Sequence, residues 1–279
     1  MPQTIALLGD PVSHSRSPAM HNAAFKALGL DLHYEAWHTP SEQLAERVAA
    51  LRQAQFLGAN VTLPHKAAVI PLIDRLEPEA ERIGAVNTIY KDESGALIGA
   101  NTDAPALIED LQVAANYSPQ GQSAVLLGAS GAARAAAFAL AGAGVRQLVV
   151  VNRTLERAEE LLADVVDSYS LLEELPSFIA LSPQDEALAE LLAESSLIIN
   201  ATSLGWHGDE TPLPGELIPA DALVYDMVYR HTRLLQDAEA RGARAMQGLG
   251  MLMRQGALAF ERWTHQTAPR DVMWQALQA

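Results

Sequence analysis

The stretch VLLGASGAARAAAFAL, residues 125–140, joins an apolar, strand-like run to a helix of small residues through a glycine. Folds that bind dinucleotides place the pyrophosphate at such a junction, on the free N–H groups that open the helix. Their usual fingerprint is G-x-G-x-x-G/A; Gly128 and Ala133 fit its ends, and Ser130 takes the place of the second glycine. A serine there loses some backbone closeness to the phosphate, although its hydroxyl offers a donor. Taken alone, this near-match fits an ordinary strand–helix turn equally well.

The next strand-like run, VVVNRTLERA at residues 149–158, shifts that balance. It ends at Asn152, Arg153 and Thr154, about 20 residues past the glycine loop, where an NAD enzyme carries Asp or Glu for the ribose 2′-hydroxyl. An arginine here favours a 2′-phosphate, and Arg157 can stand beside it because it follows one helical turn later. The alternative is that Thr154 only caps a helix and that both arginines are solvated. We favour the NADP interpretation.

Short apolar runs alternate with helical patterns along the whole chain, which indicates an α/β fold with largely parallel sheets covered on both faces. Strands are predicted at residues 4–9, 32–38, 56–63, 123–128, 146–152, 177–181, 196–200 and 222–227. Helices are predicted at residues 17–29, 41–53, 64–73, 103–115, 131–144, 154–166, 184–193, from 232 onward, at 248–264 and at 269–277. A turn signal at residues 92–95 between two further strand-like pieces predicts a hairpin.

Length and composition exclude several classes of protein. At about 150 residues per domain, the 279 residues suggest two domains or a single large one, and 49% apolar with 19% charged residues is an ordinary globular balance. No apolar run approaches a membrane span, the chain start lacks a signal-peptide pattern, and there is no cysteine, so we expect a cytoplasmic protein. The formal charge of −15 argues against nucleic acid as a partner. Scattered histidines and unclustered carboxylates predict no metal site.

Two serines stand before the first predicted helix, in the stretch GDPVSHSRSPAMHN. Ser17 suits an N-cap with Pro18 as the first helical residue, and Gly29 suits the position that closes the helix. Capping explains Ser17 but leaves Ser15 without a role. Two hydroxyls at a helix N-terminus also make a carboxylate site, because free N–H groups and the helix dipole favour an anion there.

A second polar group lies in NVTLPHKAA, residues 60–68, at the carboxyl end of the third predicted strand. Asn60 and Thr62 are two residues apart, so their side chains point the same way, toward the edge where open α/β sheets bind ligands. Pro64 is predicted to start a helix with Lys66 in its first turn, where the helix dipole disfavours an ammonium group.

Lys66 is one of only three lysines in a chain that otherwise uses arginine for positive charge. This choice favours an amine that takes part in chemistry, although a solvated surface lysine is the ordinary alternative. Asp103 also has two interpretations. Either this residue or Thr102 caps the helix that follows, or its carboxylate holds and tunes a nearby lysine.

Together these motifs resemble the shikimate dehydrogenase family, and the resemblance runs over nearly the whole chain. The stretches that carry it in the first part are GDPVSHSRSPAMHNAAF, NVTLPHK, GAVNT and GANTD. In the second part they are GASGAARA, NRTLERA, NATSLG and YDMVY, followed by GLGMLMRQGALAFERW near the C-terminus. So many motifs in the same order make the resemblance highly specific.

The resemblance implies NADPH-dependent reduction of 3-dehydroshikimate to shikimate, with Lys66 and Asp103 as the catalytic pair. It implies that Ser15 and Ser17 bind the substrate carboxylate and that Tyr229 approaches the substrate. The residues that would hold the ring hydroxyls are Asn60, Thr62, Asn87 and Gln255. The residues that would bind NADP are Gly128, Ala129, Ser130, Gly131, Ala132, Asn152, Arg153, Thr154, Arg157, Thr202, Met227 and Gly248.

The family fold implies a discontinuous substrate-binding domain, residues 1–103 plus 241–279, and a Rossmann-type NADP-binding domain at residues 104–240, with the ligand cleft between them. Hydride arriving at a carbonyl carbon builds negative charge on oxygen, so a proton donor is needed within reach. Lys66 would donate that proton in the reducing direction and accept it in the oxidising direction. A homodimer is compatible with the sequence, which does not fix the oligomeric state.

The sequence departs from the family pattern at three places. Ser130 replaces a glycine, Trp206 stands where a methionine is usual, and the segment RHTRLL after Tyr229 lacks a proline and is shorter. Two other functions stay open on the sequence alone. One is a quinate/shikimate dehydrogenase that uses NAD or NADP, and the other is a non-catalytic NADP-binding regulator.

Overall fold

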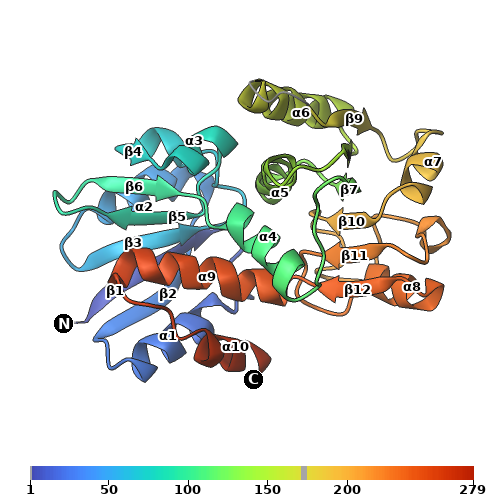
Figure 1. The fold of residues 1–279 in the computed structure, drawn as a ribbon. Helices are drawn as coiled ribbons and strands as arrows, with labels where there is room; N and C mark the ends of the chain where they lie inside the picture. Colours follow the sequence, from blue (N-terminus) through green and yellow to red (C-terminus); the bar gives the residue numbers. More distant parts are fainter. Residues whose placement is uncertain (1, 171–174) are drawn as a thin grey trace. The chain divides into compact units, whose positions relative to one another are not determined.

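The computed structural model describes residues 2–170 and 175–279, and the chain divides into two compact units. The first comprises Met1–Ala106 with Leu252–Ala279, and the second comprises Leu107–Met251. Helices α4 (Asp103–Val113) and α9 (Leu249–Thr264) lead the chain from one unit into the other. Within the described residues each unit is built on one six-stranded sheet with helices packed on it, which confirms the predicted α/β class (Figure 1).

The sheet of the first unit has the strand order β2-β1-β3-β5-β6-β4. Its strands are β1 (Gln3–Gly9), β2 (Leu32–His38), β3 (Phe56–Val61), β4 (Arg75–Leu76), β5 (Thr88–Lys91) and β6 (Leu97–Ala100). Only β5 runs against its neighbours, and the turn that joins it to β6 is the predicted hairpin. Gly95 takes a φ of 83° in that turn, and the Asp92 carboxylate accepts hydrogen bonds from the N–H groups of Ser94 and Ala96.

Helices cover both faces of this sheet. They are α1 (Ser17–Ala27), α2 (Leu44–Ala50), α3 (Pro78–Ile83), α9 and α10 (Arg270–Gln278), with short 3₁₀ turns η1 (Ser41–Gln43) and η2 (Ile70–Leu72). Side chains alternate along the strands, so that Leu8, Val61 and Ile89 form one apolar layer with Val48 and Leu51 from the α2 region. Burying each of these aliphatic side chains stabilises the fold by about 1.5–3 kcal/mol.

The helix predicted at residues 64–73 is absent. The chain forms successive turns there, and only Ile70–Leu72 is helical, as a 3₁₀ turn. Two causes are visible. The carbonyl of Lys66 accepts its hydrogen bond from Val86 N–H rather than from residue 70, and Pro71 has no N–H with which to continue a helical hydrogen-bond pattern. Lys66 is therefore not in the first turn of a helix, and the expected effect of a helix dipole on its ammonium has no basis.

The sheet of the second unit has the order β12-β11-β10-β7-β8-β9, and every pairing in it is parallel. The strands are β7 (Ser123–Leu127), β8 (Gln147–Val151), β9 (Ser177–Leu181), β10 (Leu197–Asn200), β11 (Leu223–Asp226) and β12 (Arg244–Gln247). This arrangement is the Rossmann strand order 3-2-1-4-5-6. Strand β12 pairs with β11 in this sheet, and the second unit extends to Met251, whereas the expected NADP-binding domain ends at residue 240. The stretch RAMQ, residues 244–247, was not predicted as a strand, because four residues are too few to show a strand pattern in the sequence.

Helices α5 (Gly131–Gly142), α6 (Leu155–Tyr169), α7 (Leu188–Ala193) and α8 (Arg233–Arg241) belong to this unit, with the 3₁₀ turn η3 (Gly215–Leu217). The alanines of α5 are nearly all buried, and small side chains allow its backbone to approach the sheet closely. Helix α7 starts four residues later than predicted, after turns at 183–187. No helix in the described ranges has the length and apolar character needed to cross a bilayer.

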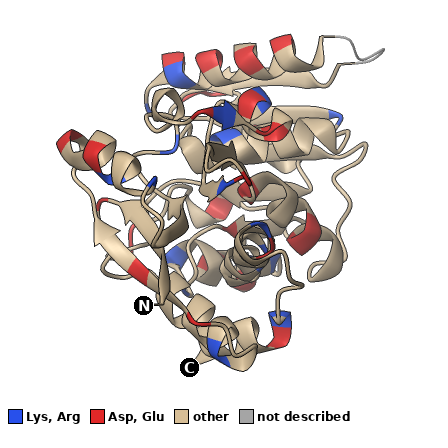
Figure 2. Ribbon diagram, turned by 90° about the vertical axis from the view of Figure 1, so that its left-hand side faces the viewer, with Lys and Arg blue, Asp and Glu red and all other residues tan. Residues whose placement is uncertain are grey.

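Charged side chains recur along the exposed face of α6, where acidic residues outnumber basic ones (Figure 2). The Asp164 carboxylate of α6 pairs with the Arg134 guanidinium of α5 at 2.7 Å, which links the two neighbouring helices. The acidic residues of this helix are Glu156, Glu159, Glu160, Asp164 and Asp167. The charge along α6 is therefore uneven, because its basic residue Arg157 lies in the first turn and most of the acidic residues follow it.

A buried histidine sits in the aromatic core of the first unit. His21 on α1 is fully buried, its ring stacks on Tyr34 with centroids 4.5 Å apart, and Trp263 meets it edge-on at 5.3 Å. Neither ring nitrogen has a hydrogen-bond partner among the described residues. Because burial penalises the charged imidazolium, the pKa of His21 falls from 6.5 to about 3.

We predict that this histidine makes the fold sensitive to acid. Between pH 6.5 and about 3 the unfolded chain binds a proton at His21 that the folded chain does not. The free energy of unfolding therefore falls in that window as pH is lowered, by about 1.4 kcal/mol per pH unit from this group. In His21→Phe, which keeps an aromatic ring, urea unfolding at several pH values should show a correspondingly flatter decline.

Substitution of the exposed His33 by glutamine provides the matched control and should leave the wild-type decline in place. Parallel stability curves for wild type and His21→Phe between pH 6.5 and 4 would show that His21 is protonated in the folded protein, contrary to the prediction.

Candidate functional site

The first unit places a lysine and an aspartate in direct contact. Lys66 Nζ lies 2.6 Å from Asp103 Oδ2, and the two side chains are only 11% and 8% exposed. Lys66 comes from the turn after β3, and Asp103 is the first residue of α4. The predicted pairing of these two residues is thus present, as a short charge-assisted hydrogen bond between largely buried groups.

The residue that caps α4 is Asn101, which sequence reasoning missed. Its side-chain oxygen accepts hydrogen bonds from the N–H groups of Asp103 at 3.0 Å and Ala104 at 3.2 Å. Its amide nitrogen donates to the carbonyl of Ala85 at 3.0 Å. Because Asn101 fills the capping position, neither Thr102 nor Asp103 is needed there, and the Asp103 carboxylate is left for Lys66.

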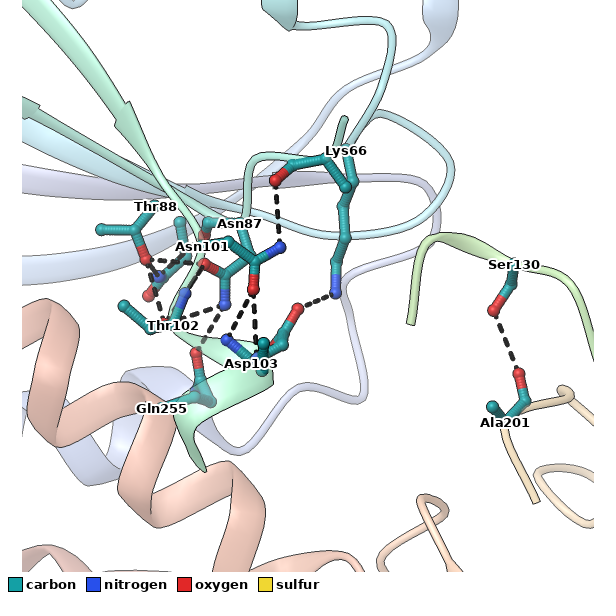
Figure 3. A network of polar contacts seen from close by, with 12 residues as sticks. Lys66, Asn87, Thr88, Asn101, Thr102, Asp103, Ser130, Ala201 and Gln255 are labelled. Atoms are coloured by element: carbon teal, nitrogen blue, oxygen red, sulfur yellow. Dashed lines mark hydrogen bonds and ion pairs between the residues drawn. The ribbon is translucent and has the colours of Figure 1, made fainter. Parts of the chain in front are cut away.

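Asn87 is the centre of a buried polar network (Figure 3). Its side-chain oxygen accepts from Thr102 N–H at 2.8 Å and from Thr88 Oγ1 at 3.1 Å. Its amide nitrogen donates to Thr102 Oγ1 at 2.9 Å and to Gln255 Oε1 at 3.4 Å. Gln255 comes from α9 and also donates to Leu252 carbonyl at 2.9 Å. The network therefore fixes the orientation of two residues that the sequence assigned to substrate binding.

The side chain of Asn60, at the end of β3, also makes most of its hydrogen bonds within the protein. Its amide nitrogen donates to Asn87 carbonyl at 3.0 Å and to Thr88 Oγ1 at 3.1 Å. Its oxygen accepts from the Tyr34 hydroxyl at 2.8 Å. Burial raises the pKa of Tyr34 above its ordinary value, so this phenol stays protonated and donates. Asn60 thus has both N–H groups used within the protein and keeps one acceptor site on its oxygen.

Ser15 and Ser17 stand at the start of α1, and Thr62 directly follows β3. Helix α1 begins at Ser17 itself, so Arg16 rather than Ser17 occupies the capping position, and no side chain caps there. The predicted N-cap role of Ser17 is therefore wrong by one residue. Ser15 Oγ accepts a hydrogen bond from Ser17 N–H at 3.2 Å. Thr62 N–H donates to Leu8 carbonyl at 2.9 Å, which holds the start of the lysine turn beside β1.

His65, directly before Lys66, was also missed by sequence reasoning. Its ring is buried, and Nε2 lies 2.6 Å from the carbonyl of Thr39 at the end of β2. Its backbone N–H donates to Thr62 carbonyl at 2.9 Å. The turn that presents Lys66 is therefore held by a side chain that points into the protein, while the carbonyl of Lys66 is held by Val86 N–H at 2.8 Å.

In the second unit, the glycine loop follows β7. Gly128 has a φ of 110°, in the region that favours glycine, and its N–H donates to Val151 carbonyl at 2.7 Å. Ser130 caps α5: its hydroxyl accepts from Ala133 N–H at 3.3 Å. The same hydroxyl donates to Ala201 carbonyl at 3.0 Å, so its single proton is used within the protein rather than being free for a phosphate. Ala129, Gly131 and Ala132 are partly exposed in this loop.

The segment after β8 presents two cations. Arg153 and Arg157 are exposed, and within residues 2–170 and 175–279 neither guanidinium pairs with a carboxylate. Thr154 occupies the capping position of α6, but its side chain makes no capping hydrogen bond. Asn152 donates from its amide to Thr154 carbonyl at 2.7 Å, which shapes the turn. The interpretation of Thr154 as a simple side-chain cap therefore loses its support.

Two further strand-end loops of this unit are tied together by Asn200 and Asp226. Asn200 Oδ1 accepts from the N–H of Thr202 at 3.0 Å and from its hydroxyl at 2.7 Å. Asn200 Nδ2 donates to Asp226 Oδ1 at 2.9 Å, and Thr232 Oγ1 donates to Asp226 Oδ2 at 2.6 Å. Burial raises the pKa of Asp226, against the opposing effect of these hydrogen bonds.

The remaining predicted residues of the second unit lie on the loop after β11 or beside it. Met227 N–H donates to Asn200 carbonyl at 3.0 Å, and a Cβ added to Gly248 would come within 2.7 Å of Met227 carbonyl oxygen. The ring of Tyr229 meets Trp206 edge-on, with centroids 4.6 Å apart. Thr202, Met227, Tyr229 and Gly248 therefore belong to one connected set of loops at the ends of β10, β11 and β12.

Comparison with known proteins places these features in context. Family models match three stretches: the shikimate dehydrogenase substrate binding domain at residues 7–89, shikimate / quinate 5-dehydrogenase at 112–204, and the shikimate 5′-dehydrogenase C-terminal domain at 248–278. An NADP(+) shikimate dehydrogenase of Moorella thermoacetica is 46% identical over 278 residues, covering 98% of this chain and 92% of the relative. That of Methanopyrus kandleri is 41% identical over 278 residues, covering 98% and 94%.

A similar solved structure is that of shikimate 5-dehydrogenase from Thermus thermophilus in complex with NADP(H) and shikimate. It superposes on this chain with a TM-score of 0.86 at 42% sequence identity, covering 99% of this chain and 98% of that one. Likeness in sequence and likeness in fold therefore extend over both units.

The glycine loop yields a test of local structure. In Gly128→Ala the new Cβ would meet Thr202 Cγ2 at 3.1 Å and the Ala201 carbonyl carbon at 3.2 Å, in addition to the strain of a positive φ. Gly121→Ala is the matched control, because Gly121 has a φ of 72° but open space around its Cβ position. The control should lose about 1–2 kcal/mol of unfolding free energy and Gly128→Ala about 1–3 kcal/mol more. Equal losses in urea titrations would show that the loop after β10 does not confine Gly128.

Proposed function

Because this chain belongs to the shikimate dehydrogenase family, we propose that it catalyses the reversible NADPH-dependent reduction of 3-dehydroshikimate to shikimate, a step of aromatic amino-acid biosynthesis. The observation that carries the proposal is the contact of 2.6 Å between Lys66 and Asp103, at the carboxyl ends of the strands of the first unit. Open α/β sheets bind their ligands at that edge. The family predicted from the sequence motifs is confirmed by the relatives.

Lys66 is the proton donor in this proposal. NADPH, when bound, supplies the hydride to the carbonyl carbon of the substrate. Negative charge then grows on the carbonyl oxygen, and the Lys66 ammonium stabilises it and transfers a proton from Nζ to that oxygen. Asp103 holds Nζ in place through the ion pair and offsets its charge. In the oxidising direction the neutral amine takes the proton back.

Substrate binding is proposed for residues that the same strand ends present. Ser15 and Ser17 lie at the N-terminus of α1, where their hydroxyl groups and the helix dipole favour a carboxylate. Asn60 accepts a hydrogen bond from a ring hydroxyl, because its own N–H groups are already used. The remaining proposed contacts are Thr62, Asn87, Gln255 and Tyr229.

NADP binding is proposed for the second unit. The residues fit this cofactor because Gly128 leaves room that a Cβ would fill and because Arg153 and Arg157 are exposed, with no carboxylate partner among the described residues. The loop of Gly128, Ala129, Ser130, Gly131 and Ala132 would hold the pyrophosphate. Asn152, Arg153, Thr154 and Arg157 would hold the adenosine 2′-phosphate. Thr202, Met227 and Gly248 would hold the nicotinamide end.

Other parts of the proposal follow from composition. The absence of cysteine supports a cytoplasmic location, and the charge of −15 supports a small-molecule substrate rather than nucleic acid.

The two units have different proposed roles: residues of the first bind the substrate, and residues of the second bind NADP. Assays with shikimate and quinate, each with NADP and NAD, separate this function from a quinate-using or NAD-using paralogue.

Removal of the lysine tests the proposed chemistry. Lys66→Ala should lower kcat for NADPH oxidation with 3-dehydroshikimate by about 10²–10⁴-fold, because general acid–base help is worth that much. KM for the substrate should change far less. Lys26→Ala is the matched control, since Lys26 is an exposed lysine of the same unit, and it should behave like wild type. Near-normal kcat in Lys66→Ala would rule out the proton-transfer role.

Removal of the arginines tests the proposed cofactor. Arg153→Ser with Arg157→Ser should raise KM for NADPH by about 10²–10⁴-fold, because each of the two lost charge-assisted hydrogen bonds costs about 1.5–3 kcal/mol. KM for NADH, which lacks the 2′-phosphate, should stay the same and serves as the control within the same protein. An equal rise for both cofactors would mean that these arginines do not read the 2′-phosphate.

A further inference from the structure

Ser130 joins two loops of the second unit that are far apart in sequence. Its hydroxyl accepts from Ala133 N–H at the start of α5. It also donates to Ala201 carbonyl, directly after β10 (Figure 3). The residues bridged by the second bond are 71 positions apart. One side chain therefore caps the helix of the glycine loop and holds the loop that carries Thr202.

The two loops meet at more than this one bond. Ala201 N–H donates to Leu127 carbonyl at 2.9 Å, so the peptide groups on both sides of Ala201 are fixed by residues of the glycine loop. Thr202 Cγ2 lies beside Gly128, where an added Cβ would be 3.1 Å from it. The segment at residues 201–202 is thus packed and hydrogen-bonded against residues 127–130.

From Ala201 the connection continues to the loop after β11. Asn200 and Thr202 on either side of Ala201 bind each other, and Asn200 also binds Asp226. Leu204 N–H then donates to Thr202 Oγ1 at 3.1 Å. A displacement of Ala201 would therefore disturb Thr202 and its neighbours, whereas the start of α6 with its arginines has no bond to this segment in the described residues.

We infer that Ser130 is a positioning residue that couples the pyrophosphate end of the cofactor site to its nicotinamide end. Resting on the proposed NADP function, this inference gives the serine a role other than a phosphate contact. The hydroxyl has one proton, and that proton is donated to Ala201. A glycine at position 130 would still start the helix, since glycine is nearly as good a cap as serine, but it would leave the Ala201 carbonyl without its donor.

Three variants separate this coupling from capping and from phosphate contact. Ser130→Gly removes the bond to Ala201 at little cost in capping, Ser130→Ala removes both, and Ser130→Thr restores the hydroxyl. Amide hydrogen exchange of the ligand-free proteins reports on the loop without any assumption about function. The segment 200–206 should exchange faster in the Gly and Ala variants and at the wild-type rate in Ser130→Thr, while residues 56–61 of the first unit serve as the unchanged control. Unaltered exchange of 200–206 in Ser130→Gly would overturn the inference.

Binding measurements then show whether the coupling reaches the cofactor. The Kd of NADP⁺ should rise by about two- to tenfold in Ser130→Gly, the worth of one neutral hydrogen bond, and return in Ser130→Thr. The Kd of 2′-phospho-ADP-ribose, which lacks the nicotinamide ring, should not change. An equal rise for both ligands would favour a phosphate contact and overturn the coupling, as would tighter binding by the glycine variant. If amide exchange of residues 200–206 follows the expected pattern but the wild-type protein does not bind NADP⁺, the proposed function is refuted instead.

Discussion

The ion pair between Lys66 and Asp103 is the constraint around which the first unit is organised. Two charges with so little exposure are costly to take out of water, and their attraction offsets that cost only when the geometry of the pair is closely held. Asn101 takes over the capping of α4 so that Asp103 is left for the lysine. Val86 binds the carbonyl of Lys66, and His65 anchors the turn on the other side. The segments that carry the pair are therefore held by contacts with residues next to three strands, β2, β5 and β6.

In both units, asparagine side chains form hydrogen bonds with peptide groups at the edge of the sheet. At the edge where the parallel strands end, and where β5 of the first unit begins, peptide groups need partners that the sheet no longer supplies. Asparagine side chains provide them: Asn87 and Asn60 in the first unit, and Asn200 in the second. Because these amides are already bonded to the protein, what they offer to a ligand is limited to their remaining lone pairs. Rigid loops with few free polar groups are the result, which favours precise placement of a small polar substrate.

The sequence was sufficient for the features that depend on local pattern. Strong periodicity or turn signals mark the strands of both sheets apart from β4 and β12, the hairpin at residues 92–95, and the glycine loop followed by α5. The sequence pattern did not predict the local structure correctly where a residue distant in the chain determines it. The carbonyl of Lys66 is diverted to Val86, which removes the helix that the pattern predicts, and β12 is stabilised only by pairing with β11. Likewise, no spacing rule shows that Ser130 binds Ala201.

Among candidate site residues, the motifs predicted Lys66 and Asp103, which the structure places in contact, whereas the sequence did not predict the residues that support them. Asn101, Thr102 and Asp103 are three adjacent residues that could each cap a helix, and only the structure distinguishes them. Turnover of 3-dehydroshikimate and NADPH by Asp103→Asn tests the ion pair itself, because this change keeps the shape of the side chain and removes its charge. We expect kcat to fall by about 10²-fold or more while KM for the substrate changes little. Turnover close to that of the wild type would mean that Lys66 acts without the charge of Asp103.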